Sequence, residues 1–177
     1  EYRDVSFLHL LCHRAGLQPN IPIEALEQFQ RENPDPRQER IKWSRMALIM
    51  DPVGPNETTF AYANNGYVIA GTMLEVKLGA KWEDLITEQV FTPLNMRSAG
   101  FGAPGTPGQL DQPVGHAPGV SGPHTPYPPG GAISDNLAAL GPAGRVHATL
   151  DDVLKFCEAH RDRTALLVVF NALFQVA

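Results

Sequence analysis

Two polar side chains that could share one site stand two residues apart, at Tyr62 and Asn64. A β-prone stretch precedes them and a helical pattern follows, so the pair falls on a turn that leads into a helix. Side chains at positions i and i+2 of such a turn can both face one cleft. A tyrosine accepts a proton near neutral pH only beside a cation, because its free hydroxyl titrates at about 10. A second interpretation stays open, in which Tyr62 is half-buried and Asn64 caps the helix.

Histidine is the other residue type in this chain whose spacing could do chemistry. His9 and His13 are four residues apart with Cys12 nearby, an arrangement that could present metal ligands on one helix face. No glutamate follows His9 as in the His-Glu-x-x-His motif, so the sequence predicts no metal site. The histidines in or beside a Gly- and Pro-rich stretch are expected only to form hydrogen bonds: His116, His124 and His147.

The composition argues for one globular domain with long loops. The chain has 177 residues, enough to bury a core, and its 14 basic and 19 acidic residues give a net charge of -5. Without a cluster of basic residues, this balance argues against nucleic acid or an anionic membrane as the main partner. The 16 glycines and 16 prolines predict long ordered loops.

Neither the first residues nor any apolar run predicts export or membrane insertion. Residues 1–4 do not begin a basic, then apolar, leader, so no signal peptide is expected. The longest apolar run, Ala165 to Phe170, has the length of a strand and falls short of the roughly 20 residues that a membrane helix needs. Cys12 and Cys157 neither demand nor exclude a disulfide, so the cellular compartment stays open.

The elements that must position these residues are mostly helices. Ser6 can cap a first helix that Gly16 would end. Thr149 can cap a last helix, with Asp152 as the acid of a capping box. Apolar periodicity predicts helices between them at about Ile23–Phe29, Arg37–Met50, Asn64–Leu78 and Lys81–Phe91.

The remaining segments predict loops and short strands. From Arg97 to Arg145 the chain shows little periodicity, which is typical of a long functional or surface loop. Thr58–Phe60 is β-prone, and Ala165–Phe170 is expected to form one buried strand. The loop contains no phosphate-binding glycine pattern, so nucleotide binding has no support.

Four blocks of sequence, in this order, together resemble one family, the serine β-lactamases of class C with their DD-peptidase, penicillin-binding-protein and esterase relatives. Residues 2–17 resemble a helix with a Leu-Leu-Thr-His-x-x-Gly-Leu ending, with Cys12 in the threonine position. Residues 60–67 resemble the Tyr-x-Asn motif with the Gly-Tyr that follows it. Residues 91–96 resemble a Pro-Leu-Gly-Met element with Asn95 for glycine, and residues 141–152 a loop into a helix near the site mouth.

The resemblance implies an α+β fold in which a helical domain lies beside an antiparallel sheet. Residues 1–160 would be one incomplete domain, mostly its helical part with long Gly/Pro loops. Residues 161–177 would be a remnant of the sheet part, with one late strand. The expected fold is therefore only partly represented in this chain.

The same resemblance implies acyl transfer to a serine, followed by hydrolysis of an ester, a β-lactam or a D-amino-acid peptide. Tyr62 would be the general base that takes the serine proton, and Asn64 the amide that positions the substrate. No metal or organic cofactor is implied. The further substrate contacts would be Tyr127 and His124 in the long loop, together with Ala143 and Gly144.

The nucleophile of that family is absent from this sequence. No serine or threonine is followed three residues later by lysine, and the closing Lys-Thr-Gly or His-x-Gly element is missing too. No Gly-x-Ser-x-Gly elbow replaces them. We therefore expect these elements in a missing segment of the same enzyme. The alternative is a non-catalytic binding module, or a degenerate member that has lost the nucleophile.

Overall fold

The computed structural model of the chain describes residues 2–22, 24–25, 35–55, 59–109, 111–117, 124–131 and 134–162. Its contacts divide the chain into two compact units. The first unit takes in Glu1–Trp82 and Leu137–Gly144, and the second takes in Glu83–Asn136 and Arg145–Ala177. Two contact units can belong to one folded domain, so the single domain expected over residues 1–160 stays a prediction.

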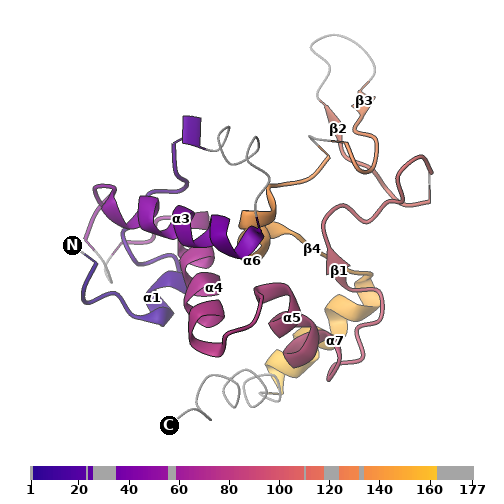
Figure 1. Ribbon diagram of the computed structural model, residues 1–177. Coiled ribbons are helices and arrows are strands. Elements are labelled where there is room, and N and C mark those ends of the chain that lie inside the picture. Colours follow the sequence, from indigo (N-terminus) through magenta and orange to yellow (C-terminus); the bar gives the residue numbers. More distant parts are fainter. Residues whose placement is uncertain are drawn as a thin grey trace. The chain divides into compact units, whose positions relative to one another are not determined.

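The first unit is built from helices. It contains α1 (Phe7–Leu11), α3 (Pro36–Ile49), α4 (Asn64–Leu78), the 3-10 turn η2 (Ala138–Leu140) and α6 (Gly141–Gly144). Helix α3 packs against α4, which also contacts α1 and α6 (Figure 1). Apolar side chains from all these segments form its core, among them Leu10, Leu17, Trp43, Val68, Ile69 and Ala139. The late segment that carries Ala139 therefore belongs to a unit otherwise made by the first part of the chain.

Helices α3 and α4 confirm the sequence prediction closely. Asp35 accepts a hydrogen bond from the Arg37 backbone N–H, and Pro36 occupies the first position, so α3 begins with favourable capping. Helix α4 ends at Gly79, whose φ of 73° is the left-handed conformation that glycine adopts without strain. Both boundaries follow from local chemistry, which is why the sequence alone could predict them.

Two glycines let α4 approach its neighbours closely. A Cβ atom at Gly66 would lie 2.8 Å from the Leu10 backbone oxygen of α1. A Cβ atom at Gly71 would overlap the ring of Pro142 in α6. The small residues of α4 therefore allow close packing against α1 and α6.

Helix α1 begins as predicted but ends earlier. The Ser6 hydroxyl accepts from the His9 N–H, and His9 Nδ1 accepts from the Ser6 N–H, which completes a capping box. The predicted terminator, Gly16, is wrong. The helix ends at Leu11, because His13 adopts the left-handed conformation with φ of 56°.

The second unit combines short helices with two short antiparallel strand pairs. Helix α5 (Trp82–Ile86), whose first residue is counted in the first unit, continues as the π-helical turn η1 (Thr87–Phe91). The predicted helix over residues 81–91 is therefore present with a widened last turn. Val90, Phe91 and Met96 form its small core. Strand β1 (Gly100–Phe101) pairs with β4 (Val146–His147), β2 (His116–Ala117) pairs with β3 (Thr125–Pro126), and α7 spans Leu150–Arg161.

The stretch from Arg97 to Arg145 is more regular than predicted. It holds β1, β2, β3, η2 and α6, whereas the sequence predicted a loop with little secondary structure. Its strands are two residues long, too short to leave an alternating apolar pattern. The opposite error occurs at Thr59 and Phe60, which were expected to be β-prone and lie in no strand.

The capping box predicted at the start of α7 is also wrong. Thr149 is the N-cap residue, but its side chain makes no capping hydrogen bond. Asp152 instead accepts hydrogen bonds from the Ser98 N–H at 2.7 Å and from the Ser98 hydroxyl at 2.6 Å. Ser98, which is distant in sequence, therefore binds the Asp152 carboxylate that the local pattern predicted to cap the start of α7.

Some predicted elements lie outside the described residues, namely most of Ile23–Phe29, all of Ala165–Phe170, and the remnant of the sheet part from residue 163 onward. In the described part of the chain, no helix has both the length and the apolar character needed to cross a membrane. Cys12 and Cys157 are both free and exposed.

Candidate active site

Tyr62 and Asn64 meet at the start of α4. The Tyr62 hydroxyl donates to Asn64 Oδ1 at 3.1 Å, and Asn64 Nδ2 donates to Asn20 Oδ1 at 2.9 Å. Tyr62 is 57% exposed, and the N-cap residue of α4 is Ala63. The alternative with a half-buried tyrosine and a capping Asn64 is therefore wrong. A phenol and an amide lie side by side at the surface, and the cleft that both would face stays a prediction.

Asn65 fixes the first turn of α4 from inside the unit. Its side chain is fully buried, accepts from Trp43 Nε1 at 2.8 Å and donates to the Gln18 carbonyl at 2.8 Å. The amide oxygen and one amide N–H each have a partner, so rotation of this turn would leave buried polar groups unpaired. Sequence reasoning missed Asn65, although a second asparagine directly after Asn64 was a visible signal.

His13 holds the segment just before α4. Its Nδ1 atom accepts a hydrogen bond from the Ala63 N–H at 3.1 Å, and its carbonyl accepts from the Ala61 N–H at 2.9 Å. The His13 ring centroid lies 4.5 Å from that of Tyr62, with 36° between the planes. The sequence pattern raised His13 only as a possible metal ligand, and it gave no sign of this contact across 50 residues.

The two histidines in and just after α1 use their ring nitrogens for hydrogen bonds. His9 Nδ1 accepts from a backbone N–H within the capping box, and His13 Nδ1 accepts from the Ala63 N–H. A nitrogen that accepts a hydrogen bond has no lone pair left for a metal. Among the described residues, no three His, Cys, Asp or Glu side chains gather as metal ligands.

The environment of the Tyr62 hydroxyl lacks a cationic partner within the described chain. There, the hydroxyl makes its hydrogen bond to Asn64, and no lysine or arginine forms a hydrogen bond or ion pair with it. Proton transfer by a phenol requires such a cation nearby. The arrangement can present a phenol oxygen and an amide to a ligand, and the cation must come from other residues.

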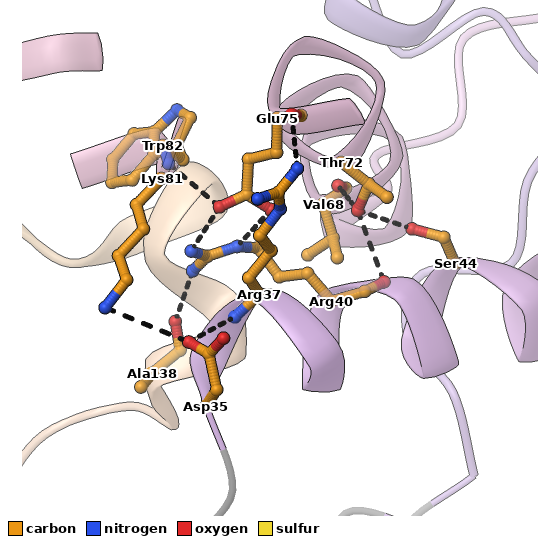
Figure 2. A network of polar contacts seen from close by, with 10 residues as sticks. All are labelled: Asp35, Arg37, Arg40, Ser44, Val68, Thr72, Glu75, Lys81, Trp82 and Ala138. Atoms are coloured by element: carbon orange, nitrogen blue, oxygen red, sulfur yellow. Dashed lines mark hydrogen bonds and ion pairs between the residues drawn. The ribbon is translucent and has the colours of Figure 1, made fainter. Parts of the chain in front are cut away.

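Ala143 and Gly144, two of the expected substrate contacts, lie in α6 of the first unit. Ala143 packs half-buried against the core and Gly144 is exposed. A buried ion pair holds this segment, because Arg40 donates to both carboxylate oxygens of Glu75 at 2.7 and 3.1 Å. The same guanidinium donates to the Ala138 carbonyl at 3.0 Å (Figure 2).

Glu75 is the centre of this network of polar contacts. Besides Arg40, its carboxylate accepts from the Trp82 N–H at 2.8 Å, and its carbonyl accepts from Arg37 Nη2 at 2.8 Å (Figure 2). Arg40 and Glu75 have no exposed side-chain surface. Their charges are therefore compensated inside the unit, which binds α3, α4 and η2 together.

Tyr127 and His124, the other expected substrate contacts, lie in the second unit beside the β2–β3 pair. The Tyr127 N–H donates to the Gly115 carbonyl at 2.8 Å, and its side chain is half-buried, whereas His124 is exposed. Of the other loop histidines, His147 donates from Nδ1 to the Gly102 carbonyl at 2.8 Å. A role of Tyr127 and His124 in substrate binding stays a prediction.

One carboxylate of the second unit has a clearly shifted pKa. Hydrogen bonds from Lys155, and then from the side chain and backbone of Ser98, lower the pKa of Asp152 from 3.8 to about 2. Lys155 also bridges from Asp152 Oδ1 at 2.6 Å to the Asn95 carbonyl at 2.8 Å. The ionised carboxylate therefore joins α7 to the turn that follows η1.

Comparisons with known proteins give these features a family. A family model described as Beta-lactamase matches residues 1–170. The chain is 30% identical over 109 residues to penicillin-binding protein 4 of Amycolatopsis lactamdurans, an alignment that covers 61% of the chain and 27% of that protein.

Solved structures give a similar result. An octameric penicillin-binding protein homologue from Pyrococcus abyssi matches with a TM-score of 0.58 and 25% identity, over 88% of this chain and 34% of that one. A D-amino acid amidase from Ochrobactrum anthropi matches with a TM-score of 0.61 and 23% identity, over 89% of this chain and 44% of that one.

The matches also confirm the expected fold class. The chain spans 27% of the curated relative and 34 and 44% of the two solved structures. Its helix-rich structure with few strands agrees with part of the α+β fold of these proteins. Because the family model covers nearly the whole chain, the protein belongs to the beta-lactamase family.

Proposed function

We propose that this chain contributes the tyrosine and asparagine side of the active site of a serine hydrolase. The family is hydrolytic. The observation that carries the proposal is the exposed contact between Tyr62 and Asn64, which is held from below by the buried Asn65. An exposed polar pair on a rigid helix start is a suitable support for chemistry, because its geometry survives substrate binding.

In the proposed reaction, Tyr62 moves one proton in each half of the cycle. Its oxygen takes the proton of a serine hydroxyl as that serine attacks the substrate carbonyl, and then gives the proton to the leaving group. In the second half, water attacks the ester carbon of the acyl-enzyme while Tyr62 takes a proton from that water. Tyr62 then returns the proton to the serine oxygen as the bond between that oxygen and the acyl carbon breaks and the acid product leaves. Asn64 donates its amide N–H to the substrate. The hydrogen bond from Asn64 to Asn20 would then exchange for one to the ligand.

The serine and its lysine are proposed to lie in a segment outside these 177 residues, because no serine here is followed three residues later by lysine. That lysine would also supply the cation that Tyr62 needs to act as a base. The substrate class is an acyl donor: an ester, a β-lactam, or a D-amino-acid peptide or amide. A relative that is a penicillin-binding protein and a structural neighbour that is a D-amino acid amidase support the last two.

A covalent probe tests this proposal. The 177-residue chain and the product of its full reading frame would each be treated with a fluorescent penicillin or a fluorophosphonate. We expect no labelling of the 177-residue chain and labelling of the longer product. In the longer product, Tyr62→Phe should lower the labelling rate at least about 100-fold, the size of effect typical for loss of a general base.

Tyr67→Phe is the matched control, because the Tyr67 hydroxyl bonds the Leu11 carbonyl of the same region and has no proposed catalytic role. It should label at close to the unmodified rate. If the full-length product contains Ser-x-x-Lys and its Tyr62→Phe variant is labelled as fast as the unmodified protein, the assignment of Tyr62 as general base is overturned.

A binding module without catalysis is the second candidate, and the missing nucleophile favours it. Such a module would use the same surface at Tyr62 and Asn64 to hold a ligand or a protein partner. A full reading frame without any serine followed three residues later by lysine, together with no covalent labelling, would favour the binding module. Covalent labelling of the purified 177-residue chain would exclude it.

A further inference from the structure

His13 occupies a position where glycine is the usual residue. It is the left-handed residue just past α1, with φ of 56°. The His13 N–H donates to the Leu10 carbonyl at 3.4 Å and the Arg14 N–H to the His9 carbonyl at 2.9 Å, the hydrogen-bond pair of a Schellman motif. A side chain in this conformation is strained, whereas glycine is not. The strain indicates that the side chain itself is needed at this point.

The described contacts of the His13 backbone and side chain lead to the segment around Tyr62. His13 accepts hydrogen bonds from Ala61 through its carbonyl and from Ala63 through Nδ1, so it holds the residues on both sides of Tyr62. Its ring lies against the Tyr62 ring. More distant ring contacts to Phe60 and Tyr67, at 5.7 and 5.2 Å between centroids, complete an aromatic cluster around it.

Tyr62 needs contacts that fix its conformation, because a side chain exposed to solvent is not held in place by packing. With 57% of its surface exposed, its own burial fixes neither the backbone nor the ring. An unrestrained side chain would lose conformational entropy each time it reached a reactive geometry. The hydrogen bond on one side and the ring contact on the other reduce that cost.

We propose that His13, as its neutral Nε2–H tautomer, is the positioning residue for Tyr62. The inference rests on the proposed function only for the catalytic role of Tyr62, because the contacts between His13 and the Tyr62 segment are independent of catalysis. The tautomer follows from chemistry: the Ala63 N–H can only donate, so Nδ1 must carry the lone pair. The proton of the neutral ring is then on Nε2.

The tautomer is tested directly by nitrogen chemical shifts of the histidine rings in the 177-residue chain at neutral pH. The His13 signals are identified by their loss in His13→Asn. We expect the pattern of an Nε2–H ring for His13 and of an Nδ1–H ring for His147, which donates to a carbonyl and serves as the internal contrast. An Nδ1–H pattern for His13 would overturn the proposal.

Three substitutions separate positioning from helix capping. His13→Gly relieves the backbone strain and removes the side chain. His13→Asn keeps an acceptor near the place of Nδ1 and tolerates the left-handed conformation. His13→Phe keeps a ring and loses the acceptor. The measurements are hydrogen exchange of the Ala63 amide, the ring resonances of Tyr62, and thermal unfolding.

We expect Ala63 exchange to rise about tenfold in His13→Gly and His13→Phe, the effect of losing one hydrogen bond, and to stay within about threefold in His13→Asn. The Tyr62 ring resonances should shift most in His13→Gly. The melting temperature of this variant should equal or exceed that of the unmodified protein. If His13→Gly leaves both the Ala63 amide and the Tyr62 ring unchanged, His13 is only a helix cap and the proposal fails.

The full-length product separates this proposal from the proposed function. If it labels covalently, His13→Gly should lower the maximal labelling rate about tenfold or more with little change in the half-saturating probe concentration, and His13→Asn should recover most of it. Equal maximal rates would refute His13 positioning and leave the hydrolase intact. If no protein labels, the hydrolase fails, and the Ala63 and Tyr62 measurements still decide the role of His13.

Discussion

The buried amide of Asn65 is the residue-scale feature on which the candidate site depends. It joins Trp43 of α3 to the Gln18 carbonyl and lies one position after Asn64. This side chain is costly to remove, since the buried Trp43 Nε1–H and the part-buried Gln18 carbonyl would each lose their hydrogen bond to it. The turn that carries Tyr62 and Asn64 is therefore anchored to the interior beneath it.

Replacement of Asn65 by alanine tests this dependence. We expect Asn65→Ala to lower the free energy of unfolding by about 1–3 kcal/mol, the cost of leaving a buried hydrogen-bonding group unpaired. Urea denaturation measures the change. Asn20→Ala is the control, because Asn20 is exposed and its hydrogen bond among the described residues is to the Asn64 side chain at the surface, so its effect should be within about 0.5 kcal/mol. Equal losses for the two variants would contradict the role given to Asn65.

At the scale of elements, α4 depends on close backbone contact with its neighbours. The Gly66 position faces the carbonyl of Leu10, and backbone cannot move aside as a flexible side chain could. The same helix carries the candidate site at its first turn, so its distance from α1 matters for His13 and Ala63 as well.

Gly66→Ala should therefore destabilise the protein by about 1–3 kcal/mol, the usual effect of overpacking. Gly54→Ala is the matched control, because no atom lies within 4 Å of its virtual Cβ and its φ is not positive. That control should be neutral or slightly stabilising. Chemical denaturation of both variants measures the difference, and a neutral Gly66→Ala would show that α4 and α1 are not in this close contact.

The start of α7 gives an element-scale prediction for pH. The folded pKa of Asp152 is lowered from 3.8 to about 2, so the unfolded chain binds the proton more readily. The carboxylate therefore contributes stability above pH 3.8, and this contribution is lost as the pH falls toward about 2. Asp152→Asn should flatten the fall in melting temperature over that range.

Lys155→Met provides the second arm of this experiment, because Lys155 is the largest cause of the lowered pKa. It should shift the acid-induced fall in melting temperature toward higher pH. If the melting temperatures of the unmodified protein and Asp152→Asn fall in parallel between pH 3.8 and 2, the predicted contribution of ionised Asp152 to stability is contradicted.

At the scale of the whole molecule, chain segments that are distant in sequence close the first unit. The segment Leu137–Gly144 returns to helices formed by the first part of the chain, and Arg40 binds it through the Ala138 carbonyl. Arg40 and Glu75 are completely buried, so each is stable there only in the presence of the other. The expected substrate contacts Ala143 and Gly144 depend on this return.

Arg40→Met should cost about 3–5 kcal/mol, because it leaves the Glu75 carboxylate buried without a counterion. The double variant Arg40→Met with Glu75→Leu should be more stable than Arg40→Met alone, since the stranded charge is gone. Thermal unfolding ranks the variants, and hydrogen exchange of residues 138–144 should accelerate in Arg40→Met. A double variant less stable than the single one would contradict the account of the buried pair.

The sequence by itself determined the features that are encoded locally. The bounds of α3 and α4 and the Ser6 cap depend on neighbours within one or two helical turns. The ordered sequence blocks indicated the family. Local patterns failed where a distant partner intervened. Asp152 bonds Ser98 across 54 residues and not its own helix terminus, and Gly16 does not end α1.

Only the tertiary structure decided which side chains support the candidate site. The bonds from Trp43 to Asn65, from Ala63 to His13 and from Arg40 to Ala138 join residues 22, 50 and 98 positions apart. Such pairs leave no periodicity in the sequence, because each partner is chosen by its position in space. His13, for which the sequence predicted no metal site, thus becomes the support of Tyr62 once the chain is folded.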